Sequence, residues 1–326
     1  MSLAQVAAAA RSAAALPLTL AVAAVDVDAG FGFGAAEGPD GFDGFGGGGG
    51  NGGGGGGAVG VDDSVELPVA SASKLLLLAE VARRLDSGEL RADAVVPIED
   101  GDVTGGTGLL RRLLRGRDAA DAGAGVWTVE DLAWLTASVS DNTATNALLR
   151  LVGLPATERL ARSLGLTRLT LHDRVRDVRG PGVPPVFATG TAGDLARLVA
   201  LAVRGDLVTP GASARLLAWM RANTDHGLVP ALVQHDPYAE CFPDPLPGGL
   251  LVANKTGTDT GVRADAGVLI GTRRVAYAVI AHWDVALGPS TERAAVHAIR
   301  EVGRALAAGA LRGEPAPCAL LRQPGG

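Results

Sequence analysis

Three strand-like runs near the C-terminus constrain the fold of this 326-residue chain more than any other feature. They are LLVANKTGT (250–258), ADAGVLIG (264–271) and RVAYAVIAHW (274–283), and each is rich in residues that favour strands. Only short turns separate them, and such turns join antiparallel neighbours because a parallel pair needs a crossover of about a dozen residues. The runs therefore predict one antiparallel sheet at this end of the chain.

The N-terminal segment is predicted to add a helix and two strands to that sheet. Residues 3–14 favour a helix, and residues 18–27 favour a strand because the β-former valine recurs in them. The longer stretch LTLAVAAVDVDAGFGFG (18–34) predicts a hairpin with its turn at residues 28–30, where Asp-Ala-Gly is a turn signal.

The same segment does not have the composition of an export signal. Its apolar stretches are short and are broken by Gln5, Arg11 and Pro17, with no charged n-region before them and no A-x-A cleavage site. No run of about 18 apolar residues exists, so no membrane span is predicted. The chain as given is expected to be cytoplasmic, and a different start codon would leave export open.

A glycine-rich tract follows the first strands. Residues 35–60 contain unbroken glycine runs at 46–50 and 52–57, and such a composition cannot bury enough apolar surface to offset its backbone entropy. A nucleotide-binding glycine loop is the functional alternative, but neither GK[ST] nor a following helix accompanies the runs. The tract is therefore interpreted as a flexible insertion.

The middle of the chain, residues 71–223, is predicted to be helical. Caps and breakers divide it into separate helices. The signals are a helix from Ser71 to Gly88, a capping box at Thr128 and Asp131, a helix opened by Pro155 and stopped at Gly165, and caps at Thr191 with Asp194 and at Thr209 with Pro210.

These elements together predict an α/β (α+β) fold. A five-stranded antiparallel sheet is flanked by the terminal helices, the second of which (290–309) has Ala295, Ile299, Val302 and Leu306 on one face. The expected organisation is a single domain over residues 1–326, with a cleft between its two lobes as the natural active site. Its parts are a sheet lobe (1–70 and 224–310), an all-helical lobe (71–223) and a tail (311–326).

Composition excludes several other classes of protein. Apolar residues make up 47% and charged residues 20%, which is typical of a globular chain, and the net charge of −6 argues against a nucleic-acid partner. The basic cluster RRLLRGR (111–117) is interpreted as a solvated helix face. Cys241 and Cys318 and the five histidines show no disulfide or zinc spacing, so no metal and no cofactor are expected. A monomer is expected.

Three short motifs carry the chemistry, and they occur in order along the chain. They are S-x-x-K at Ser71 to Lys74, S-D-N at Ser140 to Asn142, and K-T-G at Lys255 to Gly257. Each motif alone is weak, but all three in order arise by chance in roughly one chain in a thousand. Their predicted contexts also agree, because S-x-x-K opens a helix, S-D-N lies between helices and K-T-G ends a strand.

The spacing gives the residues distinct chemical roles. Residues i and i+3 share a helix face, so Lys74 can reach the Ser71 hydroxyl, which needs a base to become a nucleophile. Lys74 can be that base only if its pKa falls, through burial and through a second cation, for which Lys255 is the candidate. Ser140 can relay a proton. The backbone N–H groups of Ser71 and Thr258 can form an oxyanion hole.

Each of these residues also has a purely structural interpretation. Ser71 could only cap a helix, Ser140 to Asn142 could only form a turn between helices, and Lys255 could be a solvated strand end.

The three motifs resemble those of the class A β-lactamases, within the wider group of penicillin-recognising serine hydrolases. The stretches TVEDLAWLTASVSDNTATNALL and KTGTDTGVRADAGVLI are similar to this family beyond the motifs, and the resemblance covers roughly residues 19–34 and 62–308. It implies a β-lactamase/transpeptidase-like fold and an acyl-enzyme on Ser71. It also implies a substrate-binding role for Asn142, for Thr256, Gly257 and Thr258 beside Lys255, and for Arg263 as a carboxylate ligand.

One departure from the family bears on turnover. Class A β-lactamases carry a deacylating glutamate in an E-x-x-L-N pattern, and the matching stretch LHDRVRDVRGPGVPP (171–185) has none. Asp173 and Asp177 are the candidate substitutes. The resemblance therefore predicts a β-lactam hydrolase, with two alternatives: a specialised esterase, amidase or transacylase, or a sensor that binds β-lactams or peptides without turnover.

Overall fold

The structure is a computed structural model that describes residues 3–12, 16–29, 57–114, 126–236 and 249–311. Cys241, Cys318 and the predicted tail beyond residue 311 lie outside the described residues. Among the described helices, none combines the length and the apolar character that crossing a bilayer requires.

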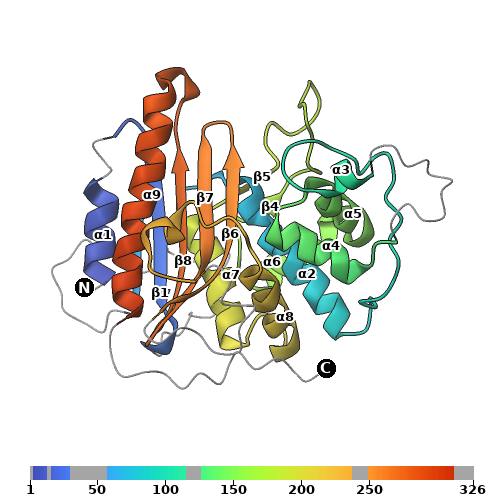
Figure 1. Cartoon of the computed structure of the whole chain (residues 1–326), viewed down its shortest axis with the longest axis horizontal. Coiled ribbons are helices and arrows are strands. Elements are labelled where there is room, and N and C mark those ends of the chain that lie inside the picture. The colour runs from blue at the N-terminus through green and yellow to red at the C-terminus, as the bar shows by residue number, and fades with distance from the viewer. Residues whose placement is uncertain (1–2, 13–15, 30–56, 115–125, 237–248, 312–326) are drawn as a thin grey trace.

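A five-stranded antiparallel sheet forms one half of the molecule, as Figure 1 shows. The meander predicted near the C-terminus is confirmed as β6 (Leu251–Asp259), β7 (Val262–Ile270) and β8 (Arg274–His282). β1 (Thr19–Asp26) lies beside β8 along its whole length. The order β2-β1-β8-β7-β6 leaves β6 as an edge strand, so one side of its backbone is free of sheet pairing.

The second N-terminal strand differs from the prediction. The strand that pairs with β1 is β2 (Ala58–Val61), with Val22 opposite Val61, whereas residues 31–34 of the predicted hairpin lie outside the described residues. The predicted insertion over residues 35–60 is therefore wrong at its end. β2 was missed because it follows a glycine run and has only four residues, one of them Gly60. A strand this short cannot show an alternating pattern.

The terminal helices lie side by side on the outer face of the sheet (Figure 1), where α1 packs on β1 and β2 and α9 packs on β7 and β8. α1 runs from Leu3 to Ser12 and α9 from Pro289 to Ala310. The predicted apolar face of α9 is confirmed, since all four of its residues are fully buried.

The other half of the molecule is mainly helical. It contains α2 (Lys74–Asp86), α3 (Leu110–Leu113), α4 (Val129–Ser138), α5 (Asn142–Val152), α6 (Leu154–Ser163), α7 (Ala192–Arg204) and α8 (Pro210–Arg221). The caps predicted at Thr128, Thr191 and Thr209 are confirmed by side-chain hydrogen bonds to the first turn of each helix. α7 packs against β1 and β8, on the face of the sheet opposite α9.

Two predictions for this helical half need correction. A small three-stranded sheet interrupts it, formed by β3 (Leu67–Pro68), β5 (Ala188–Gly190) and β4 (Thr170–Leu171), and strands of two or three residues leave no periodic signal. The helix predicted to start at Ser71 starts at Lys74, because the segment η3 (Ala70–Ser73) is a 3₁₀ turn.

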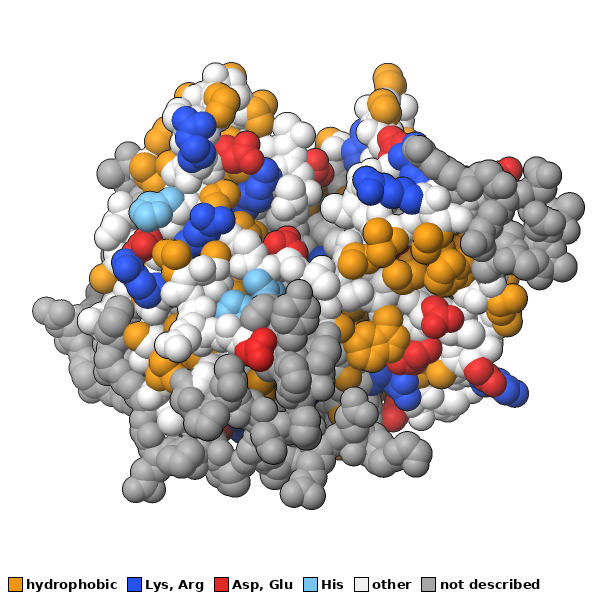
Figure 2. Space-filling model, viewed as in Figure 1, with side chains coloured by type: hydrophobic (Ala, Val, Ile, Leu, Met, Phe, Trp, Pro, Cys, Tyr) orange, Lys and Arg blue, Asp and Glu red, His pale blue; other side chains and the backbone are white. Residues whose placement is uncertain are grey.

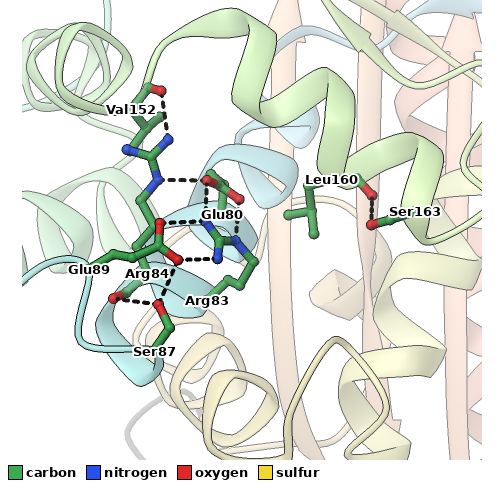
Figure 3. A network of polar contacts seen from close by, with 8 residues as sticks. All are labelled: Glu80, Arg83, Arg84, Ser87, Glu89, Val152, Leu160 and Ser163. Carbon is green, nitrogen blue, oxygen red and sulfur yellow. Dashed lines mark hydrogen bonds and ion pairs between the residues drawn. The ribbon is translucent and has the colours of Figure 1, made fainter.

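A buried ionic network fixes the far end of α2 (Figure 3). The Glu80 side chain is almost fully buried and accepts hydrogen bonds from Arg83 Nε at 2.9 Å and from Arg84 Nε at 2.6 Å. Arg84 also donates to the carbonyl of Val152 at the end of α5, at 3.0 Å. A buried carboxylate needs such partners, and here they join the helix that carries Lys74 to the helix that follows S-D-N.

Two glycines of α9 provide a test of the packing behind the sheet. A Cβ at Gly303 would collide with the backbone carbonyl of Val229, whereas a Cβ at Gly309 would meet nothing within 4 Å. We expect Gly303→Ala to cost about 1–3 kcal/mol through overpacking. We expect Gly309→Ala to stabilise the protein by about 0.5 kcal/mol, because alanine is the better helix former. Thermal melts of the two variants should move in opposite directions, and equal shifts would contradict this packing.

Candidate active site

The S-x-x-K motif, the S-D-N motif and the strand that carries K-T-G meet at one cleft between the two halves of the molecule. The cleft has a volume of about 500 Å³ and is lined by Ser71, Asn142 and Thr258 among others. Figure 2 shows a notch between the sheet side and the helical side of the molecule. The other lining residues are Ala70, Gly105, Gly106, Thr107, Arg111, Val175, Arg176, Asp177, Phe187 and Asp259.

Ser71 lies on a strained turn that touches the sheet. The preceding residue, Ala70, has φ +46°, a conformation that costs free energy for a residue with a Cβ and that clusters at functional sites. A Cβ at Gly257 of β6 would lie 2.5 Å from the carbonyl of Val69 and 3.1 Å from the Ser71 nitrogen. Only glycine at 257 therefore lets the edge strand approach the turn that carries Ser71 this closely.

The K-T-G motif lies in the middle of β6 and not at its end as predicted. The strand continues to Asp259, so Lys255 pairs with Ala266 and Thr258 pairs with Arg263 on β7. Because β6 is an edge strand, its unpaired backbone side faces the cleft beside Ser71.

Lys74 is fully buried beneath the cleft. Its Nζ lies 2.8 Å from the Ser140 carbonyl, 2.7 Å from Asn142 Oδ1 and 3.2 Å from Ser140 Oγ. The Ser140 carbonyl and Asn142 Oδ1 can only accept hydrogen bonds. A neutral amine has two N–H donors, which satisfy these two acceptors, and its lone pair remains free to accept a proton. Burial, reinforced by the positive charge of Lys255, holds the pKa of Lys74 well below its usual value.

Ser140 is also held in a strained conformation, with φ +55°. Its carbonyl accepts from both Lys74 and the Thr107 hydroxyl, the latter at 2.7 Å. The S-D-N turn therefore aims a backbone carbonyl and a hydroxyl at the same amine.

Asp141 has a structural role that the sequence did not indicate. It caps α5 by accepting from the Ala144 N–H at 2.9 Å, and it also accepts from the N–H groups of Leu109 and Leu110 at 2.7 Å. Its carboxylate thus attaches the start of α3 to the S-D-N turn.

Asn142 is held from both ends of its amide. Oδ1 accepts from Lys74, and Nδ2 donates to the Gly105 carbonyl at 2.8 Å. These contacts use the oxygen and one of the two N–H donors of the Asn142 amide. Its predicted role in binding a substrate carbonyl therefore depends on the second Nδ2 hydrogen.

Lys255 is also fully buried, and its Nζ donates to the Thr256 carbonyl at 2.8 Å. Burial lowers the pKa of the Lys255 ammonium to about 8, against the opposing effect of the carboxylates of Asp225 and Asp265. The hydroxyl of Thr256 donates to Asp225 at 2.6 Å.

A buried polar layer behind Lys255 was not predicted. Asp265 accepts from Asn254 at 2.9 Å and from the Tyr277 hydroxyl at 3.2 Å, and Asn254 in turn accepts from Asn223 at 2.8 Å. Burial raises the pKa of Asp265 to about 7. The available signal was an aspartate within the apolar run ADAGVLIG, since a carboxylate inside a core strand needs partners.

Arg263 lies outside the cleft that holds Ser71. It lines a neighbouring pocket of about 550 Å³ with Trp283 and Glu292, and the two pockets share Thr258 and Asp259. Its guanidinium forms an ion pair with Glu292 and stacks over the Trp283 ring at 5.6 Å. The predicted carboxylate ligand is thus already paired with a carboxylate of the chain itself.

The loop after α6 separates the two candidate aspartates. Asn146 of α5 binds the backbone of Val175 on both sides, accepting from its N–H at 2.8 Å and donating to its carbonyl at 3.0 Å. This anchor presents Val175, Arg176 and Asp177 to the cleft. Asp173 lines a different pocket and binds Arg176 Nε at 2.5 Å.

Asp177 is the carboxylate of this loop that faces the cleft. It accepts from the Thr104 hydroxyl at 2.6 Å and from the Gly105 N–H. These hydrogen bonds hold its pKa below the usual value, which makes it a weak base. Within the described residues, no group of three or more His, Cys, Asp or Glu side chains could hold a metal ion.

Comparison with known proteins agrees with this geometry. Residues 53–309 match the Beta-lactamase enzyme family. The chain is 33% identical over 210 residues to a β-lactamase of Streptomyces fradiae, covering 62% of this chain and 61% of that protein. It is 33% identical over 122 residues to the β-lactamase regulatory protein BlaB of Streptomyces cacaoi, covering 37% and 36%. The chain thus spans between a third and two thirds of the length of these curated relatives.

Solved structures share the fold. A β-lactamase from Sphaerobacter thermophilus DSM 20745 superposes with a TM-score of 0.71 at 24% identity, covering 94% of this chain and 96% of that one. The structure of PBP-A superposes with a TM-score of 0.70 at 20% identity, with the same coverage. At these identities the likeness supports the β-lactamase/transpeptidase-like fold alone.

Proposed function

The chain belongs to the beta-lactamase enzyme family, and we propose that it attacks its substrate with Ser71 to form an acyl-enzyme. The observation that carries the proposal is the environment of Lys74. A fully buried amine with a lowered pKa lies one helical turn from the serine at the cleft. Such an amine can accept the serine proton near neutral pH.

Acylation then proceeds with a balanced transfer of one proton. Lys74 Nζ takes the proton of Ser71 Oγ as the oxygen attacks the substrate carbonyl, and the backbone N–H groups of Ser71 and Thr258 stabilise the developing oxyanion. When the carbon–nitrogen bond of the amide breaks, the proton returns from Lys74 through Ser140 Oγ, which lies 3.2 Å away, to the leaving nitrogen.

Lys255 is proposed to act as a cation and not as a base. Its positive charge lowers the pKa of Lys74. Lys255 is fully buried, but Thr258 and Asp259 of the same strand line the cleft, so its charge favours an acidic group of the substrate on the leaving-group side. The substrate class that fits these groups is a β-lactam or a related activated amide or ester.

Deacylation is proposed to be slow. The loop that faces the cleft offers Val175, Arg176 and Asp177, and no glutamate. Asp177 is the one loop carboxylate among these lining residues, and hydrogen bonds from Thr104 and Gly105 weaken it as a base. Deacylation then relies on this weak base, and the loss of an effective general base costs up to about 10²–10⁴-fold in rate.

Mixing the protein with a chromogenic cephalosporin tests this proposal. We expect a burst of about one equivalent followed by slow turnover, with the acyl group mapped to the peptide that contains Ser71 by mass spectrometry. Asp177→Asn should lengthen the lifetime of the adduct, whereas Asp173→Asn, the matched control outside the cleft, should not. Rapid turnover without a burst, unaffected by either variant, would contradict the proposed role of this loop.

A sensor is the second candidate function. The similarity to a protein named as a β-lactamase regulatory protein and the absence of a loop glutamate both favour it. The same experiment separates the two functions, because a sensor retains its acyl group for hours whereas an enzyme releases it repeatedly. An activated ester should turn over in an esterase and not in a sensor.

A further inference from the structure

The helical wall of the cleft carries an arginine that the motifs do not include. We infer that Arg111 forms an anion-binding subsite for the acyl portion of the substrate, which makes it a determinant of specificity. This inference rests on the proposed acylation of Ser71, because it names the chemical class of the acyl group: one that bears a carboxylate or sulfonate in its side chain.

Arg111 is positioned by the S-D-N turn itself. It belongs to α3, and Asp141 fixes the start of α3 by accepting from the N–H groups of Leu109 and Leu110. Gly108 immediately precedes this contact with φ +112°, and a Cβ there would collide with Asp141. The guanidinium is therefore carried on an element anchored to the S-D-N turn. Its side chain is 43% exposed, as expected of the predicted solvated helix face, and it also lines the cleft.

The absence of a side chain at Gly105 makes room for the guanidinium at the cleft. A Cβ at this position would lie 2.5 Å from Arg111 Nη1 and 2.8 Å from Asp177 Oδ1. Gly105, Arg111 and Asp177 all line the cleft that Ser71 lines. The Gly105 backbone and the side chains of Arg111 and Asp177 therefore lie together at one point on the rim of the cleft.

The donors of Arg111 are largely unused. Its ion-pair contact among the described residues is to Asp177 Oδ2 at 3.8 Å, which is too long for a hydrogen bond. The other Asp177 oxygen already accepts from Thr104 and Gly105. A guanidinium has five N–H donors, and two of them can bind a carboxylate side by side.

The second arginine of the rim is occupied. Arg176 binds Asp173 through Nε at 2.5 Å and through Nη2 at 3.1 Å, so its charge is already matched by a two-pronged ion pair. Arg111 is therefore the rim cation that remains available to a ligand within the part of the chain that the structure describes.

The position of Arg111 selects the acyl side of the substrate. The leaving group must lie toward Ser140 and Lys255, which deliver a proton and a positive charge. Asn142 holds the Gly105 carbonyl through Nδ2, so the path from Ser71 past Asn142 leads to Gly105 and the guanidinium. A substituent on the acyl group points along that path.

Two penicillins that differ by one carboxylate test the inference. Benzylpenicillin and α-carboxybenzylpenicillin share the same ring system, and the second has an additional anion on the acyl side chain. The second-order rate constant for acylation of Ser71 is measured with each, on the parent protein and on Arg111→Gln. We expect Arg111→Gln to slow acylation by the carboxylated compound by about tenfold and by benzylpenicillin by less than about twofold.

Arg112→Gln is the matched control, since it removes the same charge from the next residue of α3, which is exposed and does not line the cleft. It should leave both rate constants unchanged. Equal losses with both penicillins, or the same loss in the control, would overturn the subsite. If neither compound labels Ser71 in the parent protein, the proposed function fails instead, so the two failures are distinguishable.

Discussion

Replacing Ser71 with alanine is expected to abolish covalent attachment of a β-lactam and to reduce turnover by about 10⁴–10⁶-fold, as for other serine nucleophiles. The hydroxyl oxygen forms the bond to the acyl group, and the residues around it in the 3₁₀ turn are Ala70, Ala72 and the buried Ser73. Intact-mass spectrometry after incubation with benzylpenicillin measures the labelling, and initial rates measure the turnover.

Ser73→Ala is the matched control for this variant. Ser73 lies in the same turn, but its hydroxyl is buried and donates to the Ala70 carbonyl at 2.7 Å. Its loss should cost about 1 kcal/mol of stability and leave labelling at one equivalent. Labelling that persists in Ser71→Ala, or that maps to another residue, would refute the assignment of the nucleophile.

Replacing Lys74 with arginine is expected to slow acylation by about 10²–10⁴-fold, the usual contribution of a general base. Arginine retains the positive charge but stays protonated in proteins, so it cannot accept the proton of Ser71. Lys74→Ala should show a similar loss. If the Lys74→Arg variant were acylated at a near-parental rate, Lys74 would serve only as a cation.

The pH dependence of acylation provides a second readout of the same pair of lysines. Protonated Lys74 cannot act as the base, so the rate should rise with pH as Lys74 loses its proton, well below the pH at which an ordinary lysine does so. Lys255 must stay charged, so the rate should fall as pH rises through about 8, the pKa of Lys255. Lys255→Arg should remove the fall at high pH while retaining the rise.

Much of the fold could be predicted because its signals are local. The three C-terminal strands, the caps at Thr128, Thr191 and Thr209, and the apolar face of α9 all depend on residues within a few positions of one another. β2 and the three-stranded sheet were missed because two to four residues cannot show a period. Their positions are set by contacts with distant strands.

The candidate site also combines residues that local motifs predict with contacts that only the folded chain shows. The motifs predicted Ser71, Lys74 and Lys255 as site residues, because their spacing is itself the signal. What the sequence could not give was which side chains are already engaged across the fold. Arg263 binds Glu292, which lies 29 residues further along the chain, and Arg111 reaches the cleft because Asp141 anchors its helix. These pairings depend on the folded positions of segments that have no shared pattern.

The close contact between Gly257 and the turn that carries Ser71 has a consequence for evolution. One side of the cleft can accept few substitutions, whereas the other side can accept many. The turn that carries Ser71 and the strand that carries Lys255 meet backbone to backbone at Gly257, with no side chain between them to adjust. Substitutions can therefore not tune the distance between them by degrees. The opposite rim, formed by Arg111, Val175 and Asp177, consists of side chains on α3 and a loop. Changes of substrate preference during evolution are accordingly expected to accumulate on this rim, over a reaction centre that stays the same.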